Sequence, residues 1–177
     1  MKMLQAGLAD MVAKTISICE WRISHIINGE YYCEQIASLV RSSLKKCINS
    51  VKTLTKRDPE AIHHIMEGLI LSGIAMGFAG ASRPASGIEH YFSHVWDMRA
   101  QEFHTNSDLH GIQVGIGTIL TLAIYEQIRH IQPNKDKALN YVSQFDLSKY
   151  QKFLQSFLGT SADNLILLEK KEGKYDK

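Results

Sequence analysis

The sequence predicts an all-α protein, a helical bundle, on three observations. Apolar residues recur every three or four positions along most of the 177 residues, no segment alternates apolar and polar residues over strand length, and the breaks fall at glycine and proline signals. The length and a composition of 45% hydrophobic and 21% charged residues are typical of one soluble globular domain. We therefore expect a single helical domain over residues 1–177.

The first half of the chain predicts three helices. Apolar spacing marks the first over Leu4–Ile18, and Asn28-Gly29 then signals a turn. A second, amphipathic helix covers Tyr32–Val51. Asp58-Pro59 opens the third, because aspartate caps helices and proline is tolerated at the first helical position. In this third helix we expect six side chains to face the core: Ile62, Ile65, Met66, Leu69, Ile70 and Ile74.

A change of composition separates the two halves. Glycine, alanine and serine fill more than half of Gly68–Gly87, and Pro84 stops a helix from running through this segment. Helices follow over Ile88–Arg99 and His110–His130, then two short helical patterns and a charged tail from Glu169. In the longer of these helices we expect three glycines to allow close helix packing: Gly111, Gly115 and Gly117.

Charge and cysteine content narrow the function. The net charge is +2, from 20 lysines and arginines against 18 acidic residues, so we expect no nucleic-acid partner. The three cysteines have no C-x-x-C spacing, which favours a reducing, cytoplasmic compartment over a disulfide scaffold. We expect no signal peptide, because the first residues lack a long apolar run. We also expect no membrane span, because glycine, serine and arginine interrupt the longest apolar run. No strand precedes the glycines, so a nucleotide-binding loop is not predicted.

Histidines carry the chemistry that the sequence offers. His90 and His94 are four residues apart on one helix face, and His110 begins the next long helix. Imidazole is the commonest metal ligand among side chains, and two imidazoles with one carboxylate leave a position open for substrate. The alternative is a pair of polar surface or capping residues. Spacing leaves six carboxylates eligible as the third ligand: Asp10, Glu20, Glu89, Asp97, Glu102 and Asp108.

Four separated motifs in the chain resemble one enzyme family. They are Ala6–Lys14, Ser72–Met76, Ser82–His94 and Leu109–Thr118. Together they are similar to the glycerol-1-phosphate dehydrogenases, members of the iron-containing alcohol dehydrogenase and glycerol dehydrogenase superfamily. The resemblance runs from about residue 3 to residue 126 and implies the C-terminal helical, metal-binding half of these two-domain enzymes.

The resemblance also implies roles for individual residues. Asp10, His90 and His110 become the metal ligands, and His94 becomes a residue beside the ligands or the substrate, with a structural role as the alternative. Lys14 becomes a contact for a substrate phosphate, against the alternative of a solvated helix lysine. The loop residues Ser82, Arg83 and Ser86 are expected to shape the pocket.

The implied reaction is hydride exchange between NAD(P)H and dihydroxyacetone phosphate, giving sn-glycerol 1-phosphate for phospholipid metabolism. Zinc suits the ligand set, and nickel or iron would also bind. Since the chain resembles the helical half alone, we expect no turnover without a partner that supplies the nicotinamide-binding domain. Two alternatives remain: half of a related glycerol or alcohol dehydrogenase, and a helical interaction domain with a vestigial metal site. An exposed apolar face would drive homo-oligomer formation.

Overall fold

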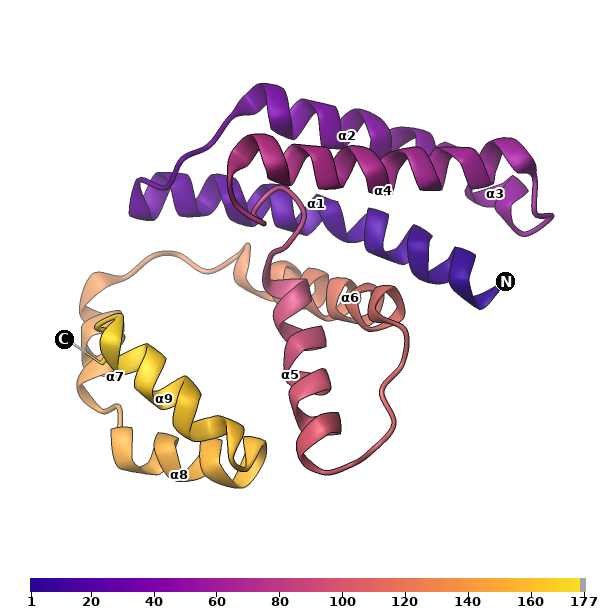
Figure 1. Ribbon diagram of the computed structural model, residues 1–177. Helices are drawn as coiled ribbons and strands as arrows, with labels where there is room; N and C mark the ends of the chain where they lie inside the picture. The colour runs from indigo at the N-terminus through magenta and orange to yellow at the C-terminus, as the bar shows by residue number, and fades with distance from the viewer. Residues whose placement is uncertain (176–177) are drawn as a thin grey trace. The chain divides into compact units, whose positions relative to one another are not determined.

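The structure, a computed structural model, describes residues 1–175. All regular secondary structure in that range is helical, in nine α-helices, which confirms the predicted all-α fold (Figure 1). These residues form two compact units. Unit 1 comprises Met1–His94 and Asp108–Tyr125, and unit 2 comprises Val95–Ser107 and the chain from Glu126 onward. The single domain expected over residues 1–177 stays a prediction, and residues 176–177 lie outside the described range.

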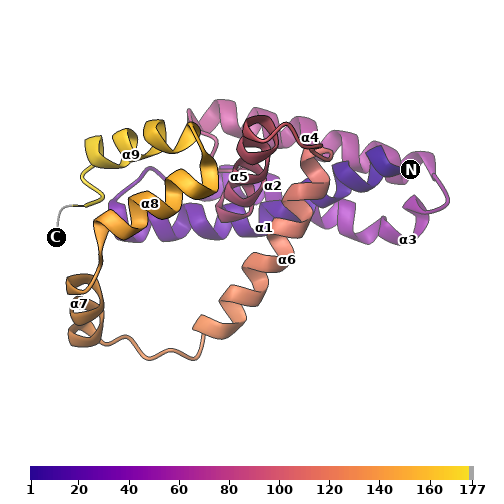
Figure 2. The same ribbon diagram turned by 90° about the horizontal axis from the view of Figure 1, so that it is seen from below.

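Three long helices of unit 1 pack against one another in pairs (Figures 1 and 2). They are α1 over Lys2–Asn28, α2 over Glu34–Asn49 and α4 over Pro59–Ala79, and the single turn α3 covers Val51–Leu54. The predicted first helix is therefore ten residues too short at its C-terminal end. Helix α1 continues to the Asn-Gly signal because its second half also carries buried side chains, among them Trp21.

Glycine and proline set the ends of these helices as the sequence indicates. Gly29 ends α1 in the left-handed region at φ 67°, and its N–H donates to the carbonyl oxygen of His25 at 3.1 Å. Pro59 stands in the first turn of α4, and Gly80 ends that helix at φ 64°. The positions of these turns bring α1, α2 and α4 side by side.

Two clusters of buried apolar side chains lie among the three helices. One contains Met11, Leu44, Cys47, Leu54, Ala61 and Ile65. The other contains Ile18, Trp21, Ile36, Ala37, Val40 and Ala75. Both clusters contain residues of α1, α2 and α4, so the three helices share these two parts of the core.

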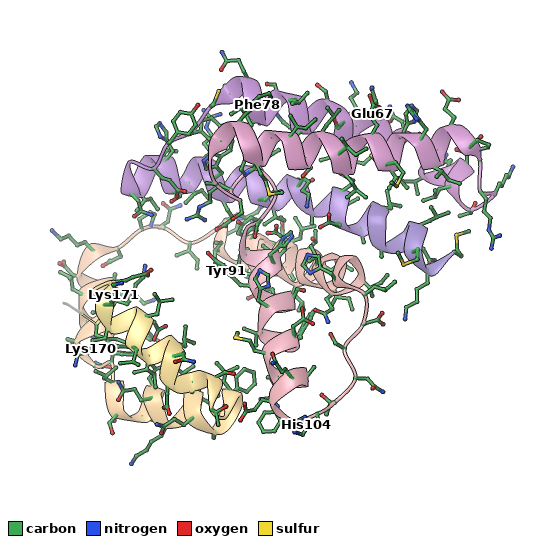
Figure 3. All side chains as sticks on the ribbon, in the orientation of Figure 1. Glu67, Phe78, Tyr91, His104, Lys170 and Lys171 are labelled. Carbon is green, nitrogen blue, oxygen red and sulfur yellow. The ribbon has the colours of Figure 1, made fainter. Side chains whose placement is uncertain are left out.

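One side of α4 is exposed and apolar, contrary to the sequence prediction. Met66, Ile70, Ile74 and Phe78 follow one another at intervals of four residues, with exposed fractions of 52%, 59%, 43% and 70%. Figure 3 labels Phe78 at one end of this row. The prediction that Met66, Ile70 and Ile74 face the core is wrong. From Gly68 to Ala79 the helix has no charged residue on any side, and packing on α1 and α2 covers only part of its surface.

Helix α5 covers Ile88–Glu102 and α6 covers His110–Ile128, close to their predicted bounds. By length and composition alone, α4 and α6 could cross a membrane, with mean hydropathies of 1.3 and 1.2. Core helices of soluble proteins meet the same criterion. The expected lack of a membrane span therefore stays a prediction.

Unit 2 contains three further helices, one more than the sequence predicts. They are α7 over Lys135–Ser143, α8 over Leu147–Leu158 and α9 over Ser161–Lys171. Helix α9 takes up the start of the predicted charged tail, because Ala162 and its apolar neighbours pack on α8. The core of this unit is built on Leu154, Leu158 and Ala162.

Candidate metal centre

The structure brings together the three residues that the family resemblance names as ligands. Asp10 lies on α1, His90 near the start of α5, and His110 at the start of α6. One potential ligand atom from each lies within 4.8 Å of those of the other two. Residues separated by up to 100 positions in the chain thus form one cluster of a carboxylate and two imidazoles in unit 1.

Small residues position these three helices at close range. A Cβ atom added to Gly111 would lie 2.1 Å from the carbonyl oxygen of Ala6, and one added to Gly117 would lie 2.4 Å from the carbonyl oxygen of Glu89. A Cβ at Gly115 would lie 2.8 Å from that of Ala9. The prediction that these glycines allow close packing is confirmed. Larger side chains would force α6 away from α1 and α5, and with it His110.

The His90 ring is buried and held from both sides. Its Nδ1 lies 2.9 Å from Oε1 of Glu89, and its Nε2 lies 3.6 Å from Oδ1 of Asp10. Oε1 of Glu89 also accepts a hydrogen bond from the backbone N–H of Gly87 at 2.9 Å. The ring therefore presents Nε2 to the cluster and Nδ1 to the protein interior.

The His110 residue is more exposed than His90, and its ring contacts a serine hydroxyl through Nδ1. Its Nδ1 lies 3.1 Å from Oγ of Ser93. Burial lowers the pKa of this ring, the neighbouring His90 lowers it further, and Asp10 acts in the opposite direction. A lowered pKa keeps the imidazole neutral at physiological pH, and the neutral ring is the form that binds metals.

Lys14 is buried beside the cluster, with 2% of its surface exposed. Its ammonium donates to Oδ1 of Asp10 at 3.0 Å and to the carbonyl oxygen of Ala85 at 3.1 Å. The alternative of a solvated helix lysine is therefore wrong. The loop between α4 and α5, which contains Ala85, therefore packs directly against α1. The small residues of this loop are consistent with such a close approach.

A cavity of about 370 Å³ opens onto the cluster. Volumes of this size hold small ligands. His94 lines it from an exposed position, with its ring centroid 6.2 Å from that of His90 and 6.3 Å from that of His110. The remaining lining residues come from α1, α4 and the following loop: Asp10, Lys14, Leu69, Ser72, Gly73, Met76, Ser82, Ala85 and Ser86.

The structure separates the loop residues that the sequence grouped as pocket residues. Ser82 and Ser86 line the cavity. Arg83 instead donates to Oε1 of Glu30 at 2.9 Å. The cavity also includes Leu69 and Met76 of α4. Sequence reasoning missed Leu69 because helical periodicity assigned it to the core face, and it considered Met76 only as the end of a family motif.

None of the other five carboxylates that spacing left eligible belongs to the group of potential ligand atoms. Glu89 accepts from the N–H of Gly87 and lies 2.9 Å from Nδ1 of His90. Glu20 accepts from the hydroxyl of Tyr125, and Asp97 accepts from the hydroxyl of Ser107. Glu102 accepts from the backbone N–H of Thr160, and Asp108 forms an ion pair with Lys2. Asp10 is the carboxylate that lies with two histidines.

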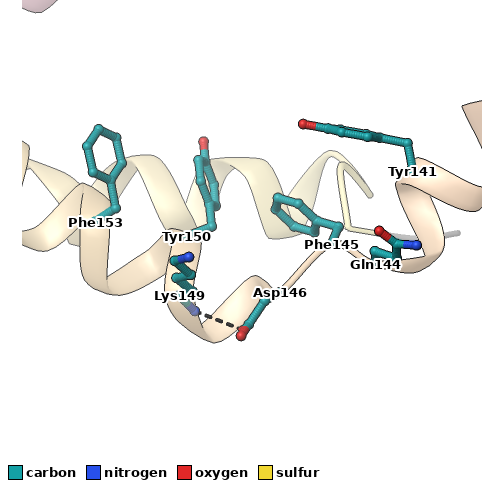
Figure 4. A pocket seen from close by; sticks show the side chains of 7 residues that line it. All are labelled: Tyr141, Gln144, Phe145, Asp146, Lys149, Tyr150 and Phe153. Atoms are coloured by element: carbon teal, nitrogen blue, oxygen red, sulfur yellow. Dashed lines mark hydrogen bonds between the residues drawn. The ribbon is translucent and has the colours of Figure 1, made fainter.

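Unit 2 has a larger cavity, of about 580 Å³, between residues of α7 and α8 (Figure 4). Four aromatic side chains line it: Tyr141, Phe145, Tyr150 and Phe153. The carboxylate of Asp146 in this cavity accepts from the backbone N–H of Lys149 at 2.9 Å, as a helix cap. The carboxylate of this cavity thus serves as a helix cap, and the cavity beside the histidines, with three potential metal ligands, is the better candidate site.

The residues of the cluster fit a divalent metal ion. One carboxylate and two imidazoles form a three-ligand set of the kind that catalytic zinc sites use, and nickel and iron accept the same donors. Both rings direct Nε2 away from their hydrogen-bonded Nδ1, and the cavity leaves room for a further ligand. The assignment of Asp10, His90 and His110 as ligands stays a prediction on this basis.

Comparison with known proteins identifies relatives of the chain. No protein-family model matches it. The glycerol-1-phosphate dehydrogenase [NAD(P)+] of Pyrococcus horikoshii is 42% identical over 117 residues, which are 66% of this chain and 33% of that protein. Proteins of the same name from Staphylothermus marinus and Halalkalibacterium halodurans are 40% and 36% identical over 124 residues, 70% of this chain and 34% and 31% of theirs.

The chain spans about a third of the length of the curated relatives it matches. The similarity lies in the C-terminal portion of those longer proteins. This agrees with the expectation from the motifs between residues 3 and 126. The chain is therefore a relative of the glycerol-1-phosphate dehydrogenases, similar in sequence to their C-terminal portion.

Proposed function

We propose that this chain is the metal-binding catalytic half of an NAD(P)-dependent sn-glycerol-1-phosphate dehydrogenase, which reduces dihydroxyacetone phosphate. One observation carries the proposal: Asp10, His90 and His110 meet beside a buried lysine in a chain related to enzymes of that name. In this function the three residues hold a divalent cation, zinc by preference. The cation supplies a Lewis acid that polarises the ketone oxygen of the substrate.

Lys14 binds the substrate phosphate in this proposal. An ammonium has three N–H donors, and its contacts with Asp10 and Ala85 use two among the described residues. The third is available to a phosphate oxygen in the cavity. Burial strengthens such a charge-assisted hydrogen bond, because little water competes for it.

The serine hydroxyls and His94 complete the cavity's contribution. Ser72, Ser82 and Ser86 line it and offer donors to hydroxyl and phosphate oxygens. His94 lies at an exposed edge near both other histidines, where it hydrogen-bonds the substrate. Together these groups orient a three-carbon phosphate with its carbonyl toward the ligand cluster.

The hydride belongs to the nicotinamide cofactor, for which the 177 residues contain no glycine-rich binding motif. We therefore assign turnover to an assembly of this chain with a nicotinamide-binding part, in a cytoplasmic, reducing compartment. The cofactor itself is NADH or NADPH. The chain alone should bind metal and substrate but transfer no hydride.

The experiment is calorimetric titration of the zinc-loaded chain with sn-glycerol 1-phosphate, glycerol and inorganic phosphate. Binding of glycerol phosphate that requires zinc supports the proposal. Preference for unphosphorylated glycerol would instead identify half of a glycerol or alcohol dehydrogenase. Lys14→Met should weaken binding of the phosphate compounds alone, whereas His94→Gln should weaken binding of glycerol 1-phosphate more than that of phosphate.

The exposed row on α4 favours a second function, a helical interaction domain with a vestigial metal site. Met66, Ile70, Ile74 and Phe78 present adjacent apolar side chains, and such patches on soluble proteins mark association surfaces. Light scattering tests this function together with metal content. A homo-oligomer that binds no metal would support it against the dehydrogenase.

A further inference from the structure

Glu89 is fully buried at the point where α5 begins, although the cluster does not use it as a ligand. Its Oε2 atom has no hydrogen-bond partner among the described residues. A buried carboxylate oxygen without a hydrogen-bond partner is costly to folding. We therefore ask which groups its other oxygen, Oε1, contacts.

Oε1 of Glu89 determines which nitrogen of His90 carries hydrogen. The backbone N–H of Gly87 already donates to this oxygen, so Oε1 acts as an acceptor. Oε1 has a second lone pair, and when it accepts from Nδ1 of His90, at 2.9 Å, that nitrogen is the protonated one. A neutral imidazole has one N–H, which leaves the lone pair on Nε2, the atom that faces Asp10.

A separate relay gives the same result at His110. The Ser93 hydroxyl has one hydrogen and donates it to Oε1 of Gln113 at 2.8 Å. Gln113 is oriented for this, because its Nε2 donates to the carbonyl oxygen of Asp108 at 3.4 Å. Ser93 is left to accept from Nδ1–H of His110, and the lone pair of that ring again lies on Nε2.

Both relays are held by close backbone packing. A Cβ at Gly87 would lie 2.7 Å from Oε2 of Glu89 and 3.0 Å from the Cα of Ser17, so the carboxylate is confined between this loop and α1. Ser93 is itself fully buried. The two acceptors thus have fixed positions before any ligand binds.

We propose that Glu89 and the Ser93–Gln113 pair are positioning residues that fix both histidines as Nδ1–H tautomers, with Nε2 of each prepared to bind the metal. This inference rests on the proposed function, since it concerns the same site. Partners of this kind orient ring ligands and raise their basicity, and their loss lowers metal affinity about 10- to 100-fold.

The first test reads the tautomers directly, in the metal-free full chain labelled with 15N. Long-range 1H–15N correlation spectra at about pH 8, above the ordinary imidazole pKa of about 6.5, distinguish a protonated Nδ1 from a protonated Nε2. We expect Nδ1–H for both rings. Glu89→Met should give mixed tautomers at His90 alone, and Ser93→Ala should do so at His110 alone, so each variant is the control for the other.

The second test measures zinc affinity by competition with a chelator. Glu89→Met and Ser93→Ala should each weaken binding about 10- to 100-fold. Glu89→Gln is the matched variant, because the N–H of Gly87 directs the amide oxygen to the Oε1 position. It should keep the His90 tautomer and recover most of the lost affinity. Circular dichroism confirms that each variant is folded.

The outcomes of these two tests distinguish a failure of this inference from a failure of the proposed function. Zinc bound by the wild type with Nε2–H rings, or unchanged tautomers and affinity in Glu89→Met and Ser93→Ala, would overturn the inference alone. Equal disturbance of both rings by either variant would also overturn it, because a general loosening has that signature. A wild type that binds no zinc overturns the proposed function and this inference with it.

Discussion

Alanine in place of Gly111 should disrupt the candidate metal centre without altering a ligand. The new Cβ would lie 2.1 Å from the carbonyl oxygen of Ala6, against 3.4 Å for an ordinary contact. Because the obstacle is backbone, no side-chain rotation relieves it. Helix α6 must move away from α1 by the difference, about 1.3 Å.

This movement acts on the ligands because of where they lie. His110 precedes Gly111 directly, and Asp10 is one helical turn after Ala6. Metal–ligand distances hold to about 0.2 Å, so a displacement of more than 1 Å removes one ligand from the set. We expect zinc affinity to fall by at least about tenfold, and overpacking to cost about 1–3 kcal/mol of unfolding free energy.

Gly77→Ala is the matched control. Gly77 lies on α4, and a Cβ there meets nothing within 4 Å. The control should gain about 0.5–1 kcal/mol from helix propensity and keep wild-type zinc affinity. Urea unfolding and chelator competition measure both quantities. If Gly111→Ala matches Gly77→Ala in stability and zinc affinity, the close crossing of α1 and α6 is wrong.

Three further predictions concern charge and surface. Lys14→Met should leave one zinc bound but weaken glycerol phosphate binding about 10- to 100-fold by calorimetry, the equivalent of one charged hydrogen bond; unchanged affinity would remove Lys14 from the site. The hydrogen bond from Ser24 holds the pKa of Glu30 below its usual value, so its contribution to stability is present above about pH 4 and is lost as pH falls further. The free energy of unfolding of Glu30→Gln should accordingly be lower than that of the wild type at pH 7 and approach it in acid. A difference that does not change with pH would contradict this. Serine at Ile70 and Phe78 should lower self-association in light scattering, and an unchanged oligomer would show that another surface is responsible.

The helices were predictable where local chemistry decides them. Pro59 and the Asn-Gly pair mark boundaries that the structure keeps, because these residues act on their own backbone. The exposure of Ile70 and Ile74 was not predictable, because the helix has no charged residue on any side from Gly68 to Ala79. Which side is covered depends on where α1 and α2 lie, and periodicity carries no information about that.

The candidate site was predictable only in part for the same reason. Histidine spacing drew attention to His90 and His110, but Asp10 was selected by resemblance among six carboxylates. The structure gives the physical reason: Asp10 is on the helix that the glycines of α6 approach. The role of Glu89 depends on a bend at Gly87 that lets neighbouring side chains meet, and no sequence pattern indicates it.

Metal content of the purified chain tests the central claim most directly. We expect one divalent ion per wild-type chain by inductively coupled plasma mass spectrometry. Asp10→Ala, His90→Ala and His110→Ala should each lose it, whereas His130→Ala, at an exposed ring, should keep it. A wild type without metal, or ligand variants that retain it, would contradict the assignment of this cluster as a metal centre.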